Sequence, residues 1–561
     1  MTCADPNLSP PSRTAPRNPT ATHETAAQQG LSWHDLVVAA ATLVGAAIRL
    51  FGLDHNALWI DEYLSVRNAL LPAPAILPLP DGYPPLFDLT LHGLIQFGGV
   101  SDWWVRLPSA VAGTLCIPLL YRIGRRVDGR LTGMLAACLL ALHPLAVWYS
   151  QEARAYALVT FCTLGSTLCL LSILRGDEQR RIGAYPLWTC FGFGLHYYYV
   201  FPFAAQACVA AYDYVRVPGR RSLWLRTALF TIPAIAIWIP GLLMDLAFQT
   251  DNDRGAPFSW LALPYTMLGF VGGFSLGPSL RDIHPAVRLG ASALSALTPH
   301  LAVILTALFS LGALTLIAFA RRLDTQRALV LLMAAVPLLG AWAASTIGVG
   351  YRPRYALPAL PFVLLWVASA VRTRLAQPAI ALVALLCGFE LVSLAQMNAP
   401  LYAREDNRSA ARYVAARGDQ SLVLLIGEGT IPFERYLDPD VHTLALSNDQ
   451  INGDLEAWLA AELMGAAGDV FLVSSRPWTV DPENRVQTLI DRRLPLRDEQ
   501  TFTGVTVRWY GRSSRGVDGA SMHAPATATE THGRHMCSPR GATMRPAARI
   551  GAQSGPHCAR S

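Results

Sequence analysis

Apolar runs long enough to cross a bilayer recur through most of this 561-residue chain. Hydrophobic residues make up 52% of the sequence and charged residues 15%, whereas an ordinary soluble domain has about 25% charged residues. A soluble chain of this length would need more charge to cover its surface, and the mean hydropathy is +0.32. The sequence therefore predicts an α-helical polytopic membrane protein.

Eleven helices are predicted from these runs, each close to the length that crosses a bilayer. They cover residues 35–53, 107–123, 131–149, 155–174, 184–198, 199–215, 224–244, 300–320, 328–349, 356–371 and 377–397. The break near residue 198 and the region 258–295 leave the count open. Residues 33–399 are expected to form one transmembrane domain with a first external loop at 54–106.

Arginine placement predicts the orientation of these helices. The chain has no lysine, so all 45 basic residues are arginine, and the formal net charge is +6. Arginine-rich loops alternate with arginine-poor ones, and the positive-inside rule assigns the rich loops to the cytoplasm. They carry Arg122, Arg125, Arg126, Arg130, Arg175, Arg180, Arg181, Arg216, Arg220, Arg221, Arg226, Arg321, Arg322, Arg327, Arg372 and Arg374. The N-terminus is then cytoplasmic, in a bacterial inner membrane, and the segment after Met397 lies outside.

Residues 400–511 have a different pattern from the membrane helices. Strands are predicted at Leu422–Ile426, Val441–Leu446, Val470–Ser474 and Val505–Tyr510, and helices at 406–417, 454–464 and 483–492. We expect a small periplasmic or extracellular α/β domain of ordinary domain size. Residues 1–32 and 512–561 lack apolar periodicity and are predicted to be disordered tails, the first of them cytoplasmic.

The residue types that are missing exclude several functions. Without lysine there is no Walker A lysine, no Schiff-base lysine and no Ser-Lys dyad. The ten cysteines form no CxxC motif and no zinc-type spacing with histidine, so neither a disulfide scaffold nor a structural zinc site is predicted. We expect no nucleic-acid partner, and the sequence leaves the oligomeric state open.

The sharpest candidate site is the acidic pair Asp61-Glu62, which follows the first predicted helix at the outer membrane face. Each of two adjacent carboxylates raises the proton affinity of the other. Such a pair can hold a general base for an incoming hydroxyl, or can bind a divalent cation such as Mg²⁺ or Mn²⁺. Taken alone, the pair is also typical of the first turn of a helix.

Further motifs follow the acidic pair in a fixed order. They are Gly82-Tyr83-Pro84-Pro85-Leu86, Arg106-Leu107-Pro108-Ser109, Tyr149-Ser150-Gln151-Glu152-Ala153-Arg154-Ala155-Tyr156 and Tyr351-Arg352-Pro353-Arg354-Tyr355-Ala356-Leu357-Pro358. Over residues 35–400 this set resembles the C-type (GT-C) glycosyltransferase superfamily. The resemblance is to bacterial glycosyltransferase family 39-like enzymes, which are related to protein O-mannosyltransferases and to aminoarabinose transferases of lipid A. Tyr83 stands where that family usually has a basic residue.

The resemblance implies transfer of a sugar from a polyprenyl-phosphate-linked donor to a lipid, polysaccharide or protein acceptor on the outer face of the membrane. Direct displacement by the acceptor would invert the anomeric centre and would require one carboxylate base. Asp61 is the candidate general base, and Glu62 would support it or bind the acceptor or a metal.

Arginines on the external side are candidates for binding the donor phosphate, because the planar guanidinium suits phosphate and is costly at this depth unless it is paired. These candidates are Arg352, Arg354 and Arg154. The further candidate substrate contacts are Tyr83, Glu152, His196, Tyr355 and Asp102, of which Asp102 could equally be a solvated loop acid. Arg49 is expected to pair with Glu62 or Asp61.

Two alternatives remain open at this stage. One is a polymerase or ligase of the O-antigen type, whose donor is a diphosphate-linked oligosaccharide and whose key residues are usually in a late external loop. The other is a non-enzymatic transporter or flippase, a class that commonly shows internal repeats and polar residues at mid-membrane. The sequence shows no internal repeat and few charged residues within helix centres, and its acidic signature lies in the first external loop, which favours the glycosyltransferase.

Overall fold

The computed structural model describes residues 31–79, 83–176, 183–252, 260–279, 297–347, 350–417, 421–466 and 468–512. Up to residue 396 the described chain is helical, and beyond residue 406 it is a mixed α/β structure. The predicted tails lie almost entirely outside the described residues, as does most of the region between 253 and 296.

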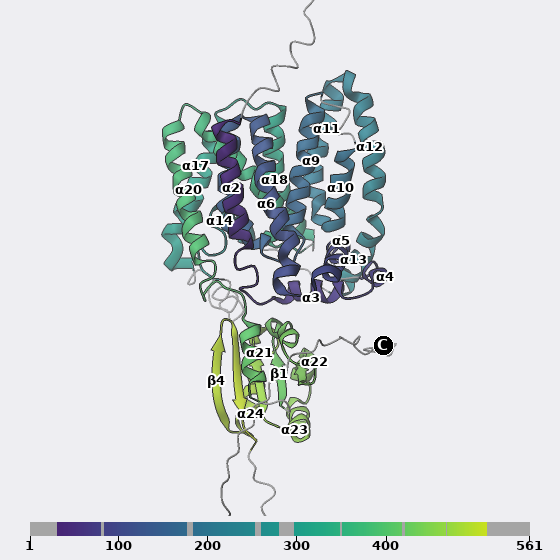
Figure 1. Cartoon of the computed structure of the whole chain (residues 1–561), viewed down its shortest axis with the longest axis vertical. Helices are drawn as coiled ribbons and strands as arrows, with labels where there is room; N and C mark the ends of the chain where they lie inside the picture. Colours follow the sequence, from purple (N-terminus) through teal and green to yellow (C-terminus); the bar gives the residue numbers. More distant parts are fainter. Residues whose placement is uncertain are drawn as a thin grey trace, which may run out of the picture. The chain divides into compact units, whose positions relative to one another are not determined.

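The helical part runs from α2 to α20, and Figure 1 shows its long helices lying along a common direction. Its helices are α2 (Trp33–Leu50), α3 (Ile60–Ala69), α4 (Ala73–Ile76), α5 (Leu86–Gly98), α6 (Asp102–Val127), α7 (Arg130–Leu142), α8 (Pro144–Ser150), α9 (Tyr156–Leu174), α10 (Ala184–Leu195), α11 (Val200–Arg216), α12 (Arg221–Ala236), α13 (Ile239–Asn252), α14 (Ala262–Gly272), α17 (Leu301–Phe319), α18 (Thr325–Ala344), α19 (Leu360–Ala368) and α20 (Ala376–Gln396). Short 3-10 segments precede α11 and α19, namely η1 (Tyr197–Tyr199) and η5 (Pro353–Ala359). Each of the eleven predicted ranges contains helix.

Seven helices of the described chain are long and apolar enough to cross a membrane, or eight if the bent pair α7 and α8 is one span. The bend of 59° falls where His143 precedes Pro144, because proline cannot continue the hydrogen-bond ladder of the preceding helix. Helices α10, α11 and α12 occupy predicted spans but have only 12, 17 and 16 residues. The chain is thus a multi-pass membrane protein, while the count of eleven rests on the sequence.

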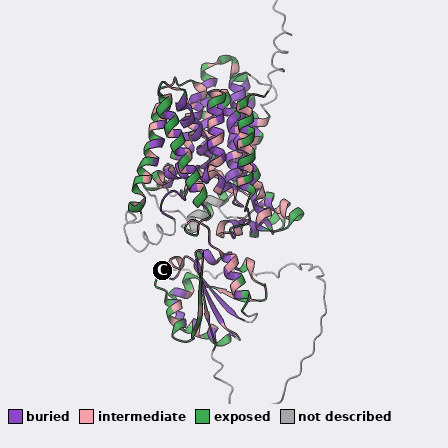
Figure 2. Ribbon diagram, turned by 60° about the vertical axis from the view of Figure 1, so that its left-hand side comes forward, coloured by how far each residue is buried: buried purple, intermediate pink, exposed green. Residues whose placement is uncertain are grey.

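The burial pattern fits a bilayer on the outside and close packing within. Helix α9 is buried over 89% of its apolar window, whereas outer helices expose large apolar side chains such as Phe309 at 70% and Leu316 at 73% (Figure 2). In the interior, Gly124 and Gly133 let α6 and α7 approach closely, since a Cβ on Gly124 would lie 2.5 Å from the Cα of Gly133. Small residues at helix crossings are typical of membrane proteins.

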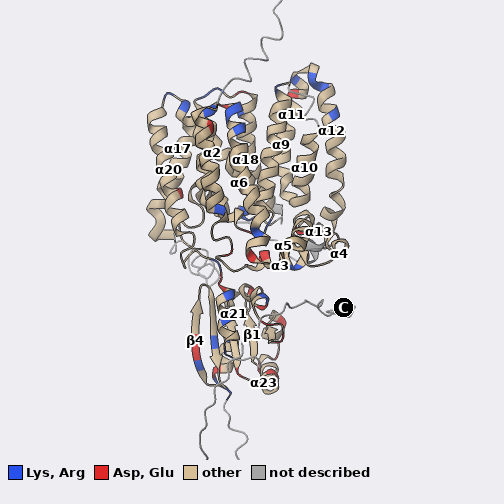
Figure 3. Ribbon diagram, viewed as in Figure 1, with Lys and Arg blue, Asp and Glu red and all other residues tan. Residues whose placement is uncertain are grey.

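The arginine-rich loops meet at one end of the bundle. Arg321 and Arg327 both pair with the carboxylate of Asp128, Arg327 at 3.0 Å, and Arg372 donates to the Asp128 main-chain carbonyl. Figure 3 shows arginine gathered at this end of the helices. The loops after α6, α17 and α19 therefore share one side, which agrees with the predicted alternation.

The part that follows the bundle is built on a five-stranded sheet in the order β2-β1-β3-β5-β4. Its strands are β1 (Leu422–Ile426), β2 (His442–Ala445), β3 (Val470–Ser474), β4 (Leu496–Phe502) and β5 (Val505–Tyr510), and its helices are α21 (Asn407–Ala415), α22 (Asn448–Asn452), α23 (Leu455–Gly465) and α24 (Arg485–Asp491). Strand β1 pairs in parallel with β2 and β3, and β5 pairs antiparallel with β3 and β4. Residues 407–512 are called the sheet body below.

The predicted strands and helices of the sheet body match the structure closely, except that the short helix α22 and the strand β4 were not predicted. Strand β4 has the polar sequence Leu-Arg-Asp-Glu-Gln-Thr-Phe and lies at the edge of the sheet with most of its residues exposed. An exposed edge strand has no apolar alternation to reveal it, and charged residues are typical of such edges.

Candidate functional site

Helix α3 carries the acidic pair in its first turn, after the N-cap residue Trp59. Successive residues of a helix point about 100° apart, so the two carboxylates face different surroundings. The Asp61 side chain is 20% exposed and that of Glu62 is fully buried. Two residues that look equivalent in the sequence are therefore expected to do different work.

Glu62 is held by a buried ion pair with Arg106 of α6. The guanidinium binds it in a bidentate manner, with Nε and Nη2 each 2.7 Å from a carboxylate oxygen. The main-chain N–H groups of Ala153 and Trp59 donate to the same carboxylate. Burial alone would raise the pKa of Glu62, but the charges of Arg106 and Arg404 outweigh it and bring this pKa to about 2. Glu62 is thus an ionised anchor of the first loop at neutral pH.

Arg106 extends this anchor to the backbone of the first loop. Besides Glu62, its Nη atoms donate to the carbonyls of Leu53, Asn56 and Ala57 at 2.8–3.1 Å. Both members of the pair are almost completely buried, with 1% exposure for Arg106. The sequence motif contained Arg106, but nothing in the local pattern distinguished it as the partner of Glu62.

Asp61 lies with two of the predicted phosphate ligands. Its Oδ2 is 2.8 Å from Nη2 of Arg354, which enters from η5. Arg154, from the loop before α9, donates to the Asp61 main-chain carbonyl at 3.3 Å and to Ser65 at 2.7 Å. Arg352, the third predicted ligand, is exposed at the N-cap of η5. The structure brings Arg154 and Arg354 to Asp61 and leaves Arg352 at the surface.

Aromatic side chains surround these two guanidinium groups. Arg154 lies 4.3 Å from the ring centre of Tyr83, and Arg354 lies 5.2 Å from that of Trp59. The hydroxyls of Tyr83 and Tyr355 are 3.3 Å apart. Tyr83 stands where the family that this chain resembles usually has a basic residue. Here Tyr83 contacts Arg154, so the positive charge beside it comes from Arg154.

Several buried polar atoms without a hydrogen-bond partner converge on the same place. Among the described residues they include Trp59 Nε1, Glu152 Oε2, the Tyr156 hydroxyl, His196 Nε2 and Arg354 Nε. Buried polar groups in native proteins are nearly always hydrogen-bonded, so a group of exceptions needs an explanation. These donors and acceptors lie together beside Asp61. A polar ligand bound there would form the missing hydrogen bonds.

Glu152 shares a cation with Glu62. Arg404 contacts Glu152 Oε1 at 2.7 Å through one Nη and Glu62 Oε2 at 2.9 Å through the other, and Trp148 Nε1 donates to Glu152 at 3.0 Å. Burial raises the pKa of Glu152 to about 7, although Arg404 opposes this effect. The sequence predicted Glu152 as a contact but missed Arg404, which follows the last membrane helix outside every quoted motif.

Asp102 and Arg49 differ from their sequence expectations. Asp102 is buried, and its carboxylate is bound by Arg408 at 2.5 Å, by Arg435 at 3.1 Å and by the Tyr436 hydroxyl at 2.7 Å. It is therefore neither a solvated loop acid nor open to substrate in this arrangement, because the sheet body covers it. Arg49 donates to main-chain carbonyls of α2 and α7 and to a serine of α8, so the expected pairing with Asp61 or Glu62 was wrong. The bend between α7 and α8 frees the carbonyls that it binds.

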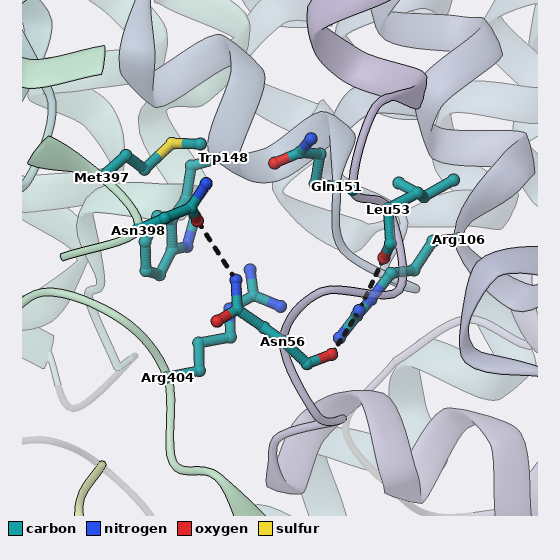
Figure 4. A pocket seen from close by; sticks show the side chains of 9 residues that line it. Leu53, Asn56, Arg106, Trp148, Gln151, Met397, Asn398 and Arg404 are labelled. Carbon is teal, nitrogen blue, oxygen red and sulfur yellow. Dashed lines mark hydrogen bonds between the residues drawn. The ribbon is translucent and has the colours of Figure 1, made fainter. Parts of the chain in front are cut away.

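A small cleft lies on the side of Arg106 and Arg404 (Figure 4). Its empty volume is about 270 Å³, part of it open to solvent. It is lined by Gly52, Leu53, Asn56, Arg106, Trp148, Gln151, Met397, Asn398 and Arg404. Asp61 and Arg354 are not among these residues, so the cleft borders the anchor of the first loop and not the candidate base.

A divalent cation does not fit the acidic pair as it is arranged here. All contacts of Glu62 are with cationic or N–H donors, and Asp61 is paired with Arg354. Among the described residues, no group of three or more His, Cys, Asp or Glu side chains could hold a metal. The chemically active groups of this site are therefore the Asp61 carboxylate and the guanidinium groups of Arg154 and Arg354.

Comparisons with known proteins bear on the fold and on the family that this chain resembles. The sequence model of the family "Dolichyl-phosphate-mannose-protein mannosyltransferase" matches residues 83–244. YycA of Bacillus subtilis (strain 168), which is named as a presumed mannosyltransferase, is 32% identical over 110 residues. That match covers 20% of this chain and spans 15% of the relative's length.

Two crystal structures of ArnT from Cupriavidus metallidurans have a similar fold. The structure in the apo state has a TM-score of 0.53 at 13% identity, covering 87% of this chain and 98% of the other. The structure bound to undecaprenyl phosphate has a TM-score of 0.51 at 13% identity, covering 85% and 98%. At this identity the likeness is one of fold. The chain shares the fold of these structures, and the family-model and YycA matches support its resemblance to the family 39-like glycosyltransferases over the segments that they cover.

Proposed function

We propose that this protein is an integral membrane glycosyltransferase that moves a sugar from a polyprenyl-phosphate-linked donor to an acceptor hydroxyl on the outer face of the cytoplasmic membrane. The observation that carries the proposal is the Asp61 carboxylate, 2.8 Å from Arg354 and next to Arg154, among buried polar atoms that lack partners. The mannosyltransferase family match and the fold shared with a protein that binds undecaprenyl phosphate support it.

The proposed reaction is a single displacement at the anomeric carbon. Asp61 accepts the proton of the acceptor hydroxyl, whose oxygen attacks the anomeric carbon while the bond to the phosphate oxygen breaks. The configuration is inverted, because one displacement occurs. The lipid phosphate leaves with an additional negative charge, which Arg354 and Arg154 stabilise through planar donor groups suited to phosphate.

The proposed orientation follows from charge. The arginine-rich end around Asp128 would face the cytoplasm, and the end that carries α3 would face outward. Lipid-linked donors suit this side, because the sugar arrives already activated and no nucleotide is needed. The sugar and the acceptor class stay open, with lipid, polysaccharide and protein acceptors as the candidates.

The test is transfer by the purified protein in liposomes, using a panel of polyprenyl-phosphate hexoses and pentoses and an extract of envelope acceptors. Asp61→Asn should reduce transfer by about 10²–10⁴-fold, the usual contribution of a general base. Asp54→Asn, at an exposed acid of the same loop, is the matched control and should remain active. Full transfer by Asp61→Asn would rule out the assigned base. Transfer only from diphosphate-linked oligosaccharides would favour the polymerase or ligase alternative.

A further inference from the structure

Arg404 belongs to the linker, residues 397–406, which joins the membrane helix α20 to the sheet body. Its side chain is nevertheless only 7% exposed and lies between Glu62 and Glu152. The guanidinium also lies 4.7 Å from the ring centre of Trp148. Arg404, which lies beyond the last membrane helix, thus supplies a positive charge to Glu62 and Glu152.

The other groups around Glu152 show why this cation matters. Glu152 is faced by Glu62 and Asp61 from α3, by Arg354 from η5 and by the phenol of Tyr149 from α8. Arg106, the nearest strong partner of Glu62, already uses its donors on Glu62 and on backbone carbonyls. Arg404 is therefore the guanidinium that makes a direct ion pair with Glu152 in the described structure.

Glu152 uses its two oxygens differently. Oε1 is bound by Arg404 and by Trp148, whereas Oε2 is buried and has no hydrogen-bond partner. A purely structural ion pair would be expected to satisfy both oxygens. This arrangement is expected of a carboxylate whose Oε1 is held by the linker and whose Oε2 can accept a hydrogen bond from a ligand.

The linker and the sheet body also form hydrogen bonds with the first loop. Arg408 donates to the Asp54 carbonyl at 2.8 Å, and the Tyr436 hydroxyl accepts from the Leu58 N–H at 2.8 Å. In the cleft of Figure 4, Asn398 of the linker accepts from Asn56 at 3.4 Å. The loop that leads into α3 is thus bound from both the membrane helices and the sheet body.

We propose that Arg404 is a positioning residue that couples the sheet body to Glu62 and Glu152, holding the Glu152 carboxylate in place so that the site is complete only when the linker is seated. The effect on catalysis rests on the proposed function, whereas the effect on local order does not. The pKa of Glu152, already raised by burial, should rise further once Arg404 is removed.

The experiment compares four purified full-length variants in detergent or liposomes. Arg404→Met removes the charge and keeps an unbranched, shorter side chain, Arg404→Lys keeps the charge, and Arg404→Met/Glu152→Gln removes the carboxylate as well. Arg476→Met, which breaks an ion pair between the sheet body and Glu405 of the linker but removes no partner of Glu62 or Glu152, is the control. Hydrogen exchange of α3 and of residues 151–155 is measured together with the pH dependence of kcat.

In Arg404→Met, the backbone amide hydrogens of α3 and of residues 151–155 should exchange at least about tenfold faster than in the wild type. Adding Glu152→Gln to this variant should restore slow exchange. The kcat of Arg404→Met at pH 7 should fall about tenfold, with the acidic limb of the pH profile moved upward, because a higher pH is needed to ionise Glu152. Arg404→Lys should recover part of both effects, and Arg476→Met should show neither.

Unchanged exchange and an unchanged pH profile in Arg404→Met would overturn the proposal, and so would exchange in Arg404→Met/Glu152→Gln that stays as fast as in Arg404→Met. If Arg404→Met does not fold, Arg404→Lys decides the question, since wild-type behaviour in both readouts would equally refute it. Exchange does not require sugar transfer, so faster exchange without any transfer activity would point to a failure of the proposed function alone.

Discussion

Replacing Glu62 by glutamine should destabilise the protein by an amount that depends on pH. The variant keeps the shape of the side chain but removes the charge that Arg106 and Arg404 contact at 2.7–2.9 Å. The pKa of Glu62 falls from an ordinary 4.5 to about 2 in the folded protein. Each tenfold change in proton affinity is worth about 1.4 kcal/mol, so the charged form contributes about 3 kcal/mol at neutral pH.

The sign of the pH dependence follows from the depressed pKa. A carboxylate whose pKa is lower in the folded state stabilises the protein above its unfolded pKa, and this contribution is lost as the pH falls toward the folded value. The difference between wild type and Glu62→Gln should therefore be full at pH 7 and reduced to roughly half near pH 3. Breaking buried ion pairs typically costs about 3–5 kcal/mol, a similar magnitude.

The measurement is thermal unfolding of the detergent-solubilised protein at pH 7 and at pH 3, with Glu456→Gln as the control. Glu456 forms an exposed ion pair with Arg493 and is itself 67% exposed, and such pairs contribute about 0–1 kcal/mol. Glu62→Gln should lower the midpoint clearly at pH 7 and by roughly half as much at pH 3. An equal loss at both pH values would show that shape and not charge governs the site, and the ionised anchor would be refuted.

Three further outcomes are expected. Arg354→Ala should raise KM for the lipid-linked donor more than KM for the acceptor, because it removes a phosphate ligand, whereas Arg352→Ala at the exposed position should leave both unchanged; equal effects of the two variants would contradict the assignment. Excess chelator should leave transfer intact, since Glu62 is already paired with arginines, and loss of transfer that Mg²⁺ or Mn²⁺ restores would contradict this. Asp102→Asn should make the linker at residues 397–406 more sensitive to limited proteolysis, because it weakens the pairs with Arg408 and Arg435; an unchanged cleavage rate would count against that contact.

The sequence predicted the parts of this structure that depend on local composition. Apolar runs place the membrane helices, and strand patterns place four of the five strands. The motif order also predicted Asp61, Arg154 and Arg354, which the structure brings together. These features could be predicted because each depends on the residues of one continuous segment of the chain.

The remaining features depend on contacts between distant segments. Glu62 and Asp61 are neighbours in sequence, and only the packing of α6 shows that one is an anchor and the other is open to a ligand. Arg404 lies 342 residues from Glu62, in a segment without a recognisable motif. Asp102 resembled a loop acid until the sheet body was seen to cover it.

The pairing of Asp128 with arginines of later loops has a consequence for biosynthesis. Asp128 leaves the ribosome 193 residues before Arg321, an interval of roughly 10–40 s at a translation rate of about 5–20 residues per second. During that time the first helices must sit in the bilayer with this carboxylate unmatched. Arrival of the later loops would then close the arginine-rich end of the bundle, so that early helices are fixed by residues made later.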